Sequence, residues 1–230
     1  MPISPNRESF HRARHRLKAL LLACCLWPCA APAGQNDLEE FVRRLESSYR
    51  GVRTLRAQFT QTYVWGGRTR TESGTVYFAR GGLMRWDYRA PKEKLFLSDG
   101  KKLMLYVPEE KQLTRSPVKS SEDVRVPFRL LLSRLNLRKV FSKLEFADQA
   151  LQHDPGSRIL RAYPKQGYEQ DYREVLMEVS PEFDIRRLVV FYPDHGTMQF
   201  TFDRIDRNVA LNSNLFRFSP PPNTEVIEQP

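Results

Sequence analysis

The sequence has few of the residues that carry out chemistry in most enzymes. Its three cysteines, Cys24, Cys25 and Cys29, all lie close to the amino terminus. Removal of that segment from the mature protein excludes disulfide bonds, thiolate catalysis and cysteine-ligated zinc together. Histidine is scarce as well, since only His153 and His195 lie beyond the segment. Both occur in predicted turns, so we interpret them as exposed turn residues and not as catalytic or metal-binding groups.

Sequence motifs for catalysis are missing too. The chain contains no G-x-S-x-G, no H-E-x-x-H and no P-loop, and Gly81-Gly82 lacks the strand-to-helix context that phosphate binding requires. The acidic pairs Glu39-Glu40 and Glu109-Glu110 lie at a helix start and a hairpin tip, where capping and solvation explain them. We therefore expect no cofactor, no metal and no enzyme. A hydrolase of envelope lipids whose carboxylates meet only in the fold is an alternative.

The amino-terminal segment is typical of a secretory signal peptide. Basic residues within 1–18 precede an apolar run from Ala19 to Ala31, and Ala31-Pro32-Ala33 forms an A-x-A cleavage site. A membrane span needs about 20 apolar residues, and this run is shorter and contains prolines. Residues 1–33 are predicted to be a signal peptide and residues 34–230 an exported domain. A retained membrane anchor is the alternative.

The charge distribution argues against a nucleic-acid partner. The chain has a formal net charge of +10, part of which belongs to the basic leader. The remaining excess favours anionic partners such as lipid headgroups. Basic and acidic residues alternate along most segments, however, as they do on solvated strand faces. We expect no nucleic acid and a monomeric protein.

The mature chain is predicted to begin with an amphipathic helix. Its apolar positions recur at helical spacing, as Leu38, Phe41, Val42, Leu45 and Tyr49. Asp37 and Glu40 have the spacing of a capping box, and Gly51 stands where a C-terminal cap is expected. The apolar stripe of this helix must pack on another element.

Beyond Thr54 the apolar residues follow a period of two, which predicts strands. They are Leu55, Ala57 and Phe59, then Val76 and Phe78, then Met84, Trp86 and Tyr88. Turn residues separate the runs, as at Gly66-Gly67, Gly81-Gly82 and Glu109-Glu110. Ser98-Asp99-Gly100-Lys101 is a strong signal for a two-residue hairpin between 94–98 and 102–107. Short turns between closely spaced strands predict an antiparallel meander.

The centre of the chain differs from these strands. Pro117 to Val126 is polar and predicts a surface loop, and Pro127 to Leu135 predicts a short, very apolar helix. Strands are expected to resume at 158–163, 172–179, 186–192 and 198–205, with a Pro-Asp-His-Gly turn at 193–196, before Leu215 to Phe218 and a polar tail. Roughly nine to eleven strands in one continuous sheet result.

These elements predict a mainly β fold in one domain. A strongly curved sheet or half-barrel, with helices packed into its open side, lets all the apolar faces be buried. The sequence leaves open whether the interior is filled or hollow.

Several segments together resemble the LolA family of periplasmic outer-membrane lipoprotein carriers. The longest is Phe78-Ala79-Arg80-Gly81-Gly82-Leu83-Met84-Arg85-Trp86-Asp87-Tyr88, followed by Leu97-Ser98-Asp99-Gly100-Lys101 and Leu105-Tyr106-Val107-Pro108. Similar in order and spacing are Leu55-Arg56-Ala57-Gln58-Phe59-Thr60-Gln61, Val126-Pro127-Phe128-Arg129-Leu130-Leu131 and Phe216-Arg217-Phe218-Ser219-Pro220-Pro221. The resemblance covers about residues 37–227.

The resemblance implies an incomplete antiparallel β-barrel closed by the N-terminal helix and a short central helix that acts as a lid. It also implies an apolar cavity that holds the acyl chains of lipoproteins during transit to the outer membrane. The partners it implies are acylated lipoproteins, an inner-membrane ABC transporter that releases them to the carrier and, in some bacteria, an outer-membrane acceptor.

Arg80 matches the family's arginine, which is associated with hydrogen-bonding the helical lid shut in the empty form. Arginine suits a latch because its five donors can reach several backbone carbonyls at once. Many relatives have proline after this arginine, whereas this chain has Gly81, so the turn is expected to be looser. Without the resemblance, Arg80 reads as a solvated residue at a strand end.

The resemblance also suggests residues of the cavity. Met84 and Trp86 match the family's aromatic-rich strand, and Tyr88 shares their face. Further residues are placed by pattern on helix and sheet faces that could close over the cavity, namely Phe41, Leu45, Phe59, Phe128, Leu131 and Leu132. Ordinary core packing is the alternative for each.

Two other functions of the same fold remain open. Acylation at Cys24 would make the chain a membrane-anchored lipoprotein acceptor. A lipid-sensing regulatory domain would report on the envelope instead of transporting cargo, although such sensors usually carry a second domain.

Overall fold

The computed structural model describes residues 33–118 and 135–229. The helical elements are α1 (Ala33–Arg50), α3 (Leu137–Val140), η3 (Gln149–Leu151) and η4 (Ser213–Phe216). The strands are β1 (Thr54–Trp65), β2 (Arg68–Ala79), β3 (Leu83–Ala90), β4 (Lys94–Asp99), β5 (Lys102–Val107), β6 (Gln112–Pro117), β7 (Phe141–Phe146), β8 (Arg158–Pro164), β9 (Glu174–Val179), β10 (Ile185–Phe191), β11 (Thr197–Arg207) and β12 (Glu225–Glu228). None of the helices in these ranges is long and apolar enough to cross a membrane.

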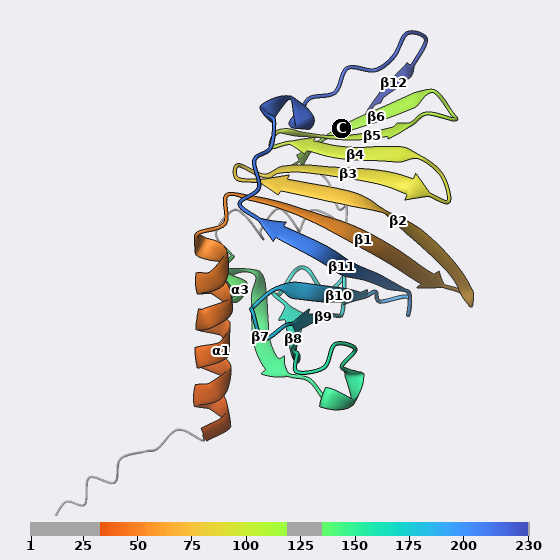
Figure 1. The fold of residues 1–230 in the computed structure, drawn as a ribbon. Helices are drawn as coiled ribbons and strands as arrows, with labels where there is room; N and C mark the ends of the chain where they lie inside the picture. Colours follow the sequence, from red (N-terminus) through yellow and green to blue (C-terminus); the bar gives the residue numbers. More distant parts are fainter. Residues whose placement is uncertain (1–32, 119–134, 230) are drawn as a thin grey trace, which may run out of the picture.

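All twelve strands form one sheet, in the order β12-β6-β5-β4-β3-β2-β1-β11-β10-β9-β8-β7. Two antiparallel meanders, β1 to β6 and β7 to β11, meet where β1 pairs with β11. The outer strands β12 and β7 are not paired with each other, so the sheet stays open (Figure 1). This confirms the prediction of a mainly antiparallel, incompletely closed β architecture with few helices.

Two strands were not predicted, which raises the number above the nine to eleven expected. β12 lies in the expected polar tail and pairs parallel with β6. Most of its residues are exposed, so its sequence shows no burial pattern that would reveal a strand. β7 precedes the expected restart at Arg158; its buried residues are Phe141 and Leu144, and a register shift between Phe141 and Lys143 breaks the period of two.

The predicted hairpin between β4 and β5 is present, and its turn depends on a glycine. Gly100 has φ +87°, in the left-handed region. A Cβ atom on Gly100 would lie 2.6 Å from the carbonyl oxygen of Gly81. Gly100 therefore allows two turns to lie against each other, a contact that any other residue would push apart.

Both predicted caps of the first helix are wrong. α1 begins at Ala33, so Asp37 lies inside the helix and does not cap it. Asp37 instead accepts hydrogen bonds from the Arg158 guanidinium at 3.1 and 2.8 Å, and these hydrogen bonds lower the pKa of Asp37. Gly51 follows the helix without adopting a positive φ, because another residue, described below, binds the terminal carbonyls.

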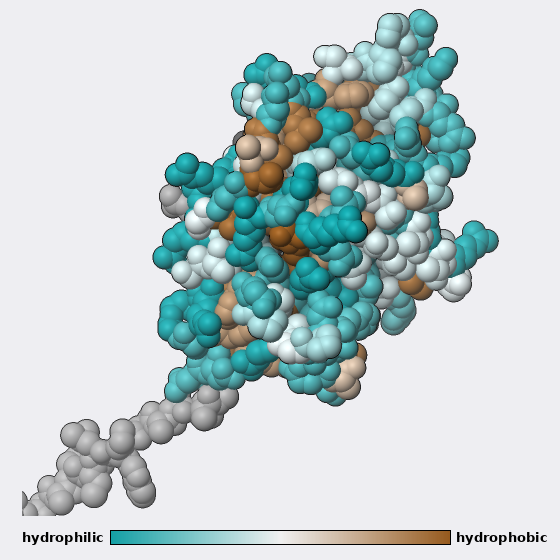
Figure 2. Space-filling model, viewed as in Figure 1, coloured by the Kyte–Doolittle hydropathy of each residue, from teal (hydrophilic) through white to brown (hydrophobic). Residues whose placement is uncertain are grey.

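The sheet buries apolar side chains on both faces, but very unequally. One face, here called the inner face, forms a large core together with Phe41, Val42, Leu45 and Tyr49 of α1. The opposite, outer face holds two small clusters, Leu95, Leu97, Met104 and Leu113 near η4, and Ala147, Ile159, Leu176 and Val189 near η3. Polar residues cover most of the face seen in Figure 2, and apolar residues show in patches between them.

The predicted central helix lies mostly outside the described residues. β6 extends through Pro117, which the sequence assigned to a loop. On either side of residues 119–134, Val118 and Leu135 are buried in the inner-face core. The chain therefore enters and leaves this segment on the face that α1 covers.

Candidate functional site

Aromatic rings from both meanders meet on the inner face. We call Phe59, Phe78, Trp86, Phe200 and Phe202 the aromatic floor. Trp86 lies at its centre, with ring centroids 4.9 Å from Phe59, 5.7 Å from Phe78 and 5.4 Å from Phe200. All five side chains are buried. Alternation along the strands puts these rings on one face because residues two apart point the same way.

Tyr88 extends the floor along β3. Its ring centroid lies 4.9 Å from that of Phe59 in an edge-on arrangement. A register shift in the β2–β3 pair at Ser73/Gly74 sets its position. A Cβ atom on Gly74 would lie 1.9 Å from the Asp87 carbonyl oxygen and 3.0 Å from the Cα of Tyr88. Glycine at this position lets β3 approach β2 closely enough to hold Tyr88 over Phe59.

The inner face changes character along the paired strands β1 and β11. Phe59 lies opposite Phe202, Gln61 opposite Phe200, and Tyr63 opposite Met198. The apolar floor thus gives way, within four residues of β1, to a buried amide and then to a tyrosine and a methionine.

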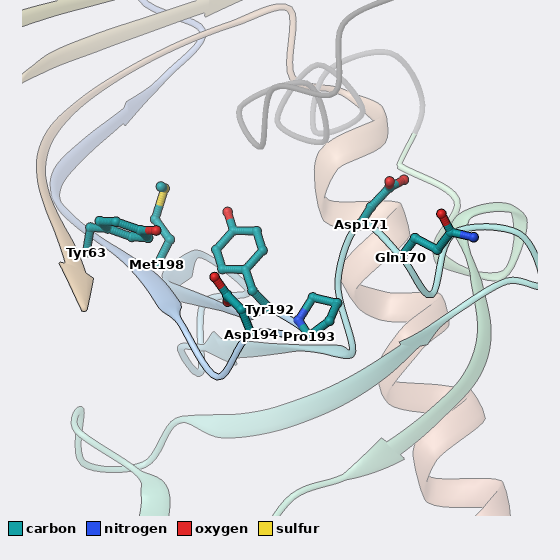
Figure 3. A pocket seen from close by; sticks show the side chains of 7 residues that line it. All are labelled: Tyr63, Gln170, Asp171, Tyr192, Pro193, Asp194 and Met198. Atoms are coloured by element: carbon teal, nitrogen blue, oxygen red, sulfur yellow. The ribbon is translucent and has the colours of Figure 1, made fainter. Parts of the chain in front are cut away.

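Tyr63 and Met198 line a pocket of about 420 Å³ at the end of these strands. The other lining residues are Gln170 and Asp171 from the segment before β9, and Tyr192, Pro193 and Asp194 from the β10–β11 turn. Figure 3 shows Tyr63 and Met198 side by side, facing Asp171 across the pocket, with Tyr192 between them. The aromatic floor therefore leads to a pocket lined by both polar and apolar side chains.

A chain of polar contacts runs between the floor and this pocket. The Lys94 ammonium bonds both Glu72 carboxylate oxygens, at 2.8 and 2.7 Å, and lies 4.2 Å from the centroid of the Tyr88 ring. The Tyr88 hydroxyl donates to Gln61 Oε1 at 2.6 Å, and Gln61 Nε2 donates to Met198 Sδ at 3.5 Å. Glu72 and Gln61 are buried, so this end of the inner face is polar despite its burial.

Arg80, at the end of β2, binds the carboxyl end of α1. Its Nε donates to the Val52 carbonyl at 3.1 Å, and its Nη2 donates to the Arg50 carbonyl. Its backbone amide donates to the Arg53 carbonyl at 3.1 Å. Arg80 thus satisfies carbonyls that a helix end leaves without partners, which is why Gly51 needs no left-handed cap.

Arg207, at the end of β11, binds the same end of α1 from the other meander. It donates to the Ser48 carbonyl at 3.3 Å and to the Phe183 carbonyl at 2.6 Å, and it pairs with Asp184. Its guanidinium lies 4.7 Å from the Tyr49 ring centroid. Burial raises the pKa of Tyr49, whose hydroxyl accepts a hydrogen bond from the Ile185 amide at 3.0 Å.

Comparison with known proteins shows the family. Residues 50–219 match the family model described as outer membrane lipoprotein carrier protein LolA. The chain belongs to the LolA family. Among LolA-family relatives, the outer-membrane lipoprotein carrier protein of Dechloromonas aromatica is 31% identical, over 92% of this chain and 97% of that one. The protein of the same name from Nitrosospira multiformis is 30% identical, over 80% of this chain and 87% of that one.

A solved structure shares the fold. An uncharacterized conserved protein from Thermus thermophilus superposes with a TM-score of 0.53 at 14% identity, covering 84% of this chain and 99% of that one. At this identity the likeness concerns the fold alone.

The predicted site residues of this LolA-family chain fall into separate places. Phe59, Met84, Trp86 and Tyr88 come together on the inner face, and Leu45 is fully buried in the same core. Phe41 also belongs to that core, but its ring packs on Phe146 and Phe183, at 5.4 and 5.3 Å. The remaining predicted cavity residues, Phe128, Leu131 and Leu132, lie outside the described residues.

The rings of the aromatic floor are buried and contact one another where the structure describes them. His153 and His195 are exposed in turns, as predicted. Among the residues that the structure describes, no group of His, Cys, Asp or Glu side chains is arranged to hold a metal ion.

Sequence reasoning missed Phe200, Phe202, Gln61 and Met198 as site residues. The alternation of Met198, Phe200 and Phe202 is a usable signal, although by itself it predicts only a strand. Nothing local reveals that β11 lies beside β1, about 140 positions earlier in the chain. That pairing brings Gln61 and Met198 together.

Proposed function

We propose that this LolA-family chain is a periplasmic carrier that shelters the acyl chains of lipoproteins on its inner face and moves them from the inner to the outer membrane. The observation that carries the proposal is the aromatic floor, a wide apolar surface that is built from both halves of the sheet and shares one core with α1. Family membership supplies the cargo class, because relatives are named outer-membrane lipoprotein carrier proteins.

A carrier is needed because acyl chains are costly to expose to water. Each CH₂ group contributes about 0.8 kcal/mol on transfer to an apolar environment. Two or three acyl chains thus amount to tens of kcal/mol, roughly the cost that holds lipidated proteins on membranes. A protein that crosses an aqueous compartment must replace the membrane with an apolar surface of similar extent.

We infer that the described arrangement of α1 and the aromatic floor is the closed form of the carrier. The floor rings touch one another and α1 packs on the same core, so acyl chains must displace α1 or the rings to enter. The energy that closes the empty form lowers the apparent affinity for cargo, which makes release possible. We assign Arg80 the role of latch, since it ties β2 to the end of α1 through carbonyls of Arg50 and Val52.

The same proposal covers location and partners. Export through removal of residues 1–33 would place the carrier in the periplasm. An inner-membrane ABC transporter would load it, and an outer-membrane acceptor would unload it. The carrier returns its cargo chemically unchanged, so the chain is not an enzyme.

Native mass spectrometry of the mature protein, coexpressed with an acylated lipoprotein, tests the function. We expect a complex of one carrier and one lipoprotein, with every acyl chain intact after dissociation. The matched control is the same lipoprotein with its acylated cysteine replaced by serine, which should not bind. Equal binding of both forms would contradict the proposal, and released fatty acid would show a hydrolase instead.

A further inference from the structure

We propose that the Gln61 side-chain amide is a hydrogen-bond donor for the acyl carbonyl groups of the cargo, at the point where the aromatic floor meets the pocket. The inference rests on the proposed carrier function and specifies which part of the cargo is recognised by a polar group.

The Gln61 side-chain amide is held in one orientation by its two hydrogen-bond partners. Tyr88 donates its hydroxyl proton to Gln61 Oε1 at 2.6 Å, which leaves the Gln61 NH₂ group directed to the opposite side. There Nε2 donates to the thioether sulfur of Met198 at 3.5 Å. A thioether is a weak acceptor. Gln61 is only 9% exposed, so a good donor is held in a buried place with a poor partner.

The neighbours of Gln61 keep it in this orientation. Lys94 lies over the Tyr88 ring and is itself held by both oxygens of Glu72. Glu72 also accepts a hydrogen bond from Arg70 at 2.7 Å. Gln61 lies opposite Glu72 in the β1–β2 pair, and Tyr88 lies opposite Lys94 in the β3–β4 pair. Side chains from four consecutive strands, β1 to β4, thus hold one amide in place, which is more order than an incidental polar residue requires.

The position of Gln61 matches the shape of an acylated lipid. Along β1 it comes one inward residue after Phe59 and one before Tyr63, so it lies about 7 Å from each along the strand. Acyl chains on the aromatic floor would place their ester or amide linkages beside Gln61 and the glyceryl and peptide parts in the pocket. Met198 contacts the Gln61 amide and also lines the pocket, where Figure 3 shows it beside Tyr63. Its flexible side chain can move aside for a stronger acceptor.

The charges of the residues that line the pocket indicate which ligands can bind there. Asp171 and Asp194 line it, and none of its described lining residues is basic. Two carboxylates disfavour a phosphate, whereas they tolerate the neutral glyceryl thioether and the peptide of a lipoprotein. The site therefore fits acylated cysteine better than a phospholipid.

Ester and ether analogues of one lipopeptide test the inference. The probes are a synthetic diacylglyceryl-cysteine peptide and its dialkyl ether analogue, which has chains of equal length but no ester carbonyls. Each probe is made with and without an N-acyl group, to distinguish ester from amide carbonyls. Because one hydrogen bond is worth about 0.5 to 1.5 kcal/mol, the native protein should prefer the carbonyl-bearing probe by about 2- to 12-fold.

Substitution of Gln61 assigns the preference to its side chain. Gln61→Leu should bind the ester and ether probes equally, with the affinity for the ether unchanged. Tyr88→Phe removes the hydroxyl that orients the amide and should reduce the preference partly. Gln58→Leu is the matched control, because Gln58 is exposed on the outer face of the same strand and should keep the full preference.

The outcomes separate the subsite from the carrier function. Binding of both probes by native protein without a carbonyl preference, or a preference that survives in Gln61→Leu, would overturn the subsite and leave the carrier function standing. Failure of native protein to bind either probe would contradict the carrier function itself.

Discussion

The two faces of the sheet bury apolar residues in different ways. On the outer face, each small cluster lies near a short 3₁₀ turn. The η3 turn is fastened by a buried ion pair: Glu178 pairs with Arg187 at 2.6 Å, and Arg187 donates to the Leu151 carbonyl at 2.6 Å. On the inner face, α1 is fastened by arginines at its ends, and Arg80 is exposed to solvent.

The contacts that hold the two covers differ in burial: those of η3 are buried, whereas Arg80 is exposed. Glu178 Oε1 accepts hydrogen bonds at 2.7 Å each from the amides of His153 and Asp154 and from the Ser157 hydroxyl. Opening that network would leave charges buried without partners, which is costly. Opening the Arg80 contact exposes to water only groups that water can bond. Under the proposed carrier function, the small clusters are the permanent part of the structure and the large inner core is the part that opens for cargo.

The largest loss of stability is expected from Glu178→Gln, which removes the buried ion pair beside η3 on the outer face. Loss of one partner leaves Arg187 buried and uncompensated, so we expect the free energy of unfolding to fall by about 3 kcal/mol at neutral pH. Urea denaturation measures it. Glu110→Gln, at an exposed turn, is the control and should change little.

The stability difference between the native protein and Glu178→Gln should depend on pH. Burial alone would raise the pKa of Glu178, but hydrogen bonds from Asp154, Ser157, Arg187 and His153 outweigh it and lower that pKa. The ionised carboxylate therefore stabilises the folded state above the usual carboxyl pKa, and this stabilisation is lost as the pH falls below about 4. The gap between native protein and variant should shrink over that range. A constant gap would contradict the role of the charge.

A smaller effect is expected from Gly74→Ala on the inner face. The added Cβ overlaps the Asp87 carbonyl oxygen, so β3 must move away from β2 near Tyr88. We expect about 1 to 3 kcal/mol of destabilisation, as for other overpacked sites, together with weaker lipopeptide binding. Gly51→Ala is the control because its Cβ position is open. Native stability in Gly74→Ala would show that the close approach is not required.

The smallest effect on stability, about 1 kcal/mol, is expected from Arg80→Leu, which removes the hydrogen bonds between β2 and the end of α1. Because the empty closed form competes with cargo, its loss should raise retention of a fluorescent lipopeptide by up to about 5-fold in a transfer assay to vesicles. Arg89→Leu, at the opposite end of the β2–β3 pair, should leave retention unchanged. Unaltered retention in Arg80→Leu would argue against the latch.

Local sequence patterns predicted much of the fold and part of the site. Alternation identified the strands that carry Phe59, Trp86 and Tyr88, and the Asp99-Gly100 turn identified a hairpin, because both signals act within a few residues. The fold class followed from the need to bury one helix stripe and many strand faces together.

The remaining features depend on contacts between distant segments. The Asp37 cap failed because a helix can begin earlier and because Arg158, far along the chain, binds that carboxylate. The Gln61–Met198 contact depends on the register between β1 and β11, and the Glu178 network depends on a loop that folds back onto β9. Neither leaves a local pattern in the sequence. β12 was missed because its partner is the backbone of β6 and not an apolar face.

The seam between β1 and β11 has a consequence for how the protein is made. β1 cannot pair with β11 until nearly all of the sequence has been synthesised. Contacts between segments so distant in sequence form slowly. Neither meander alone possesses the complete aromatic floor, because Phe59 and Trp86 belong to one and Phe200 and Phe202 to the other. The complete aromatic floor can therefore form only after α1, which shares its core, has been synthesised.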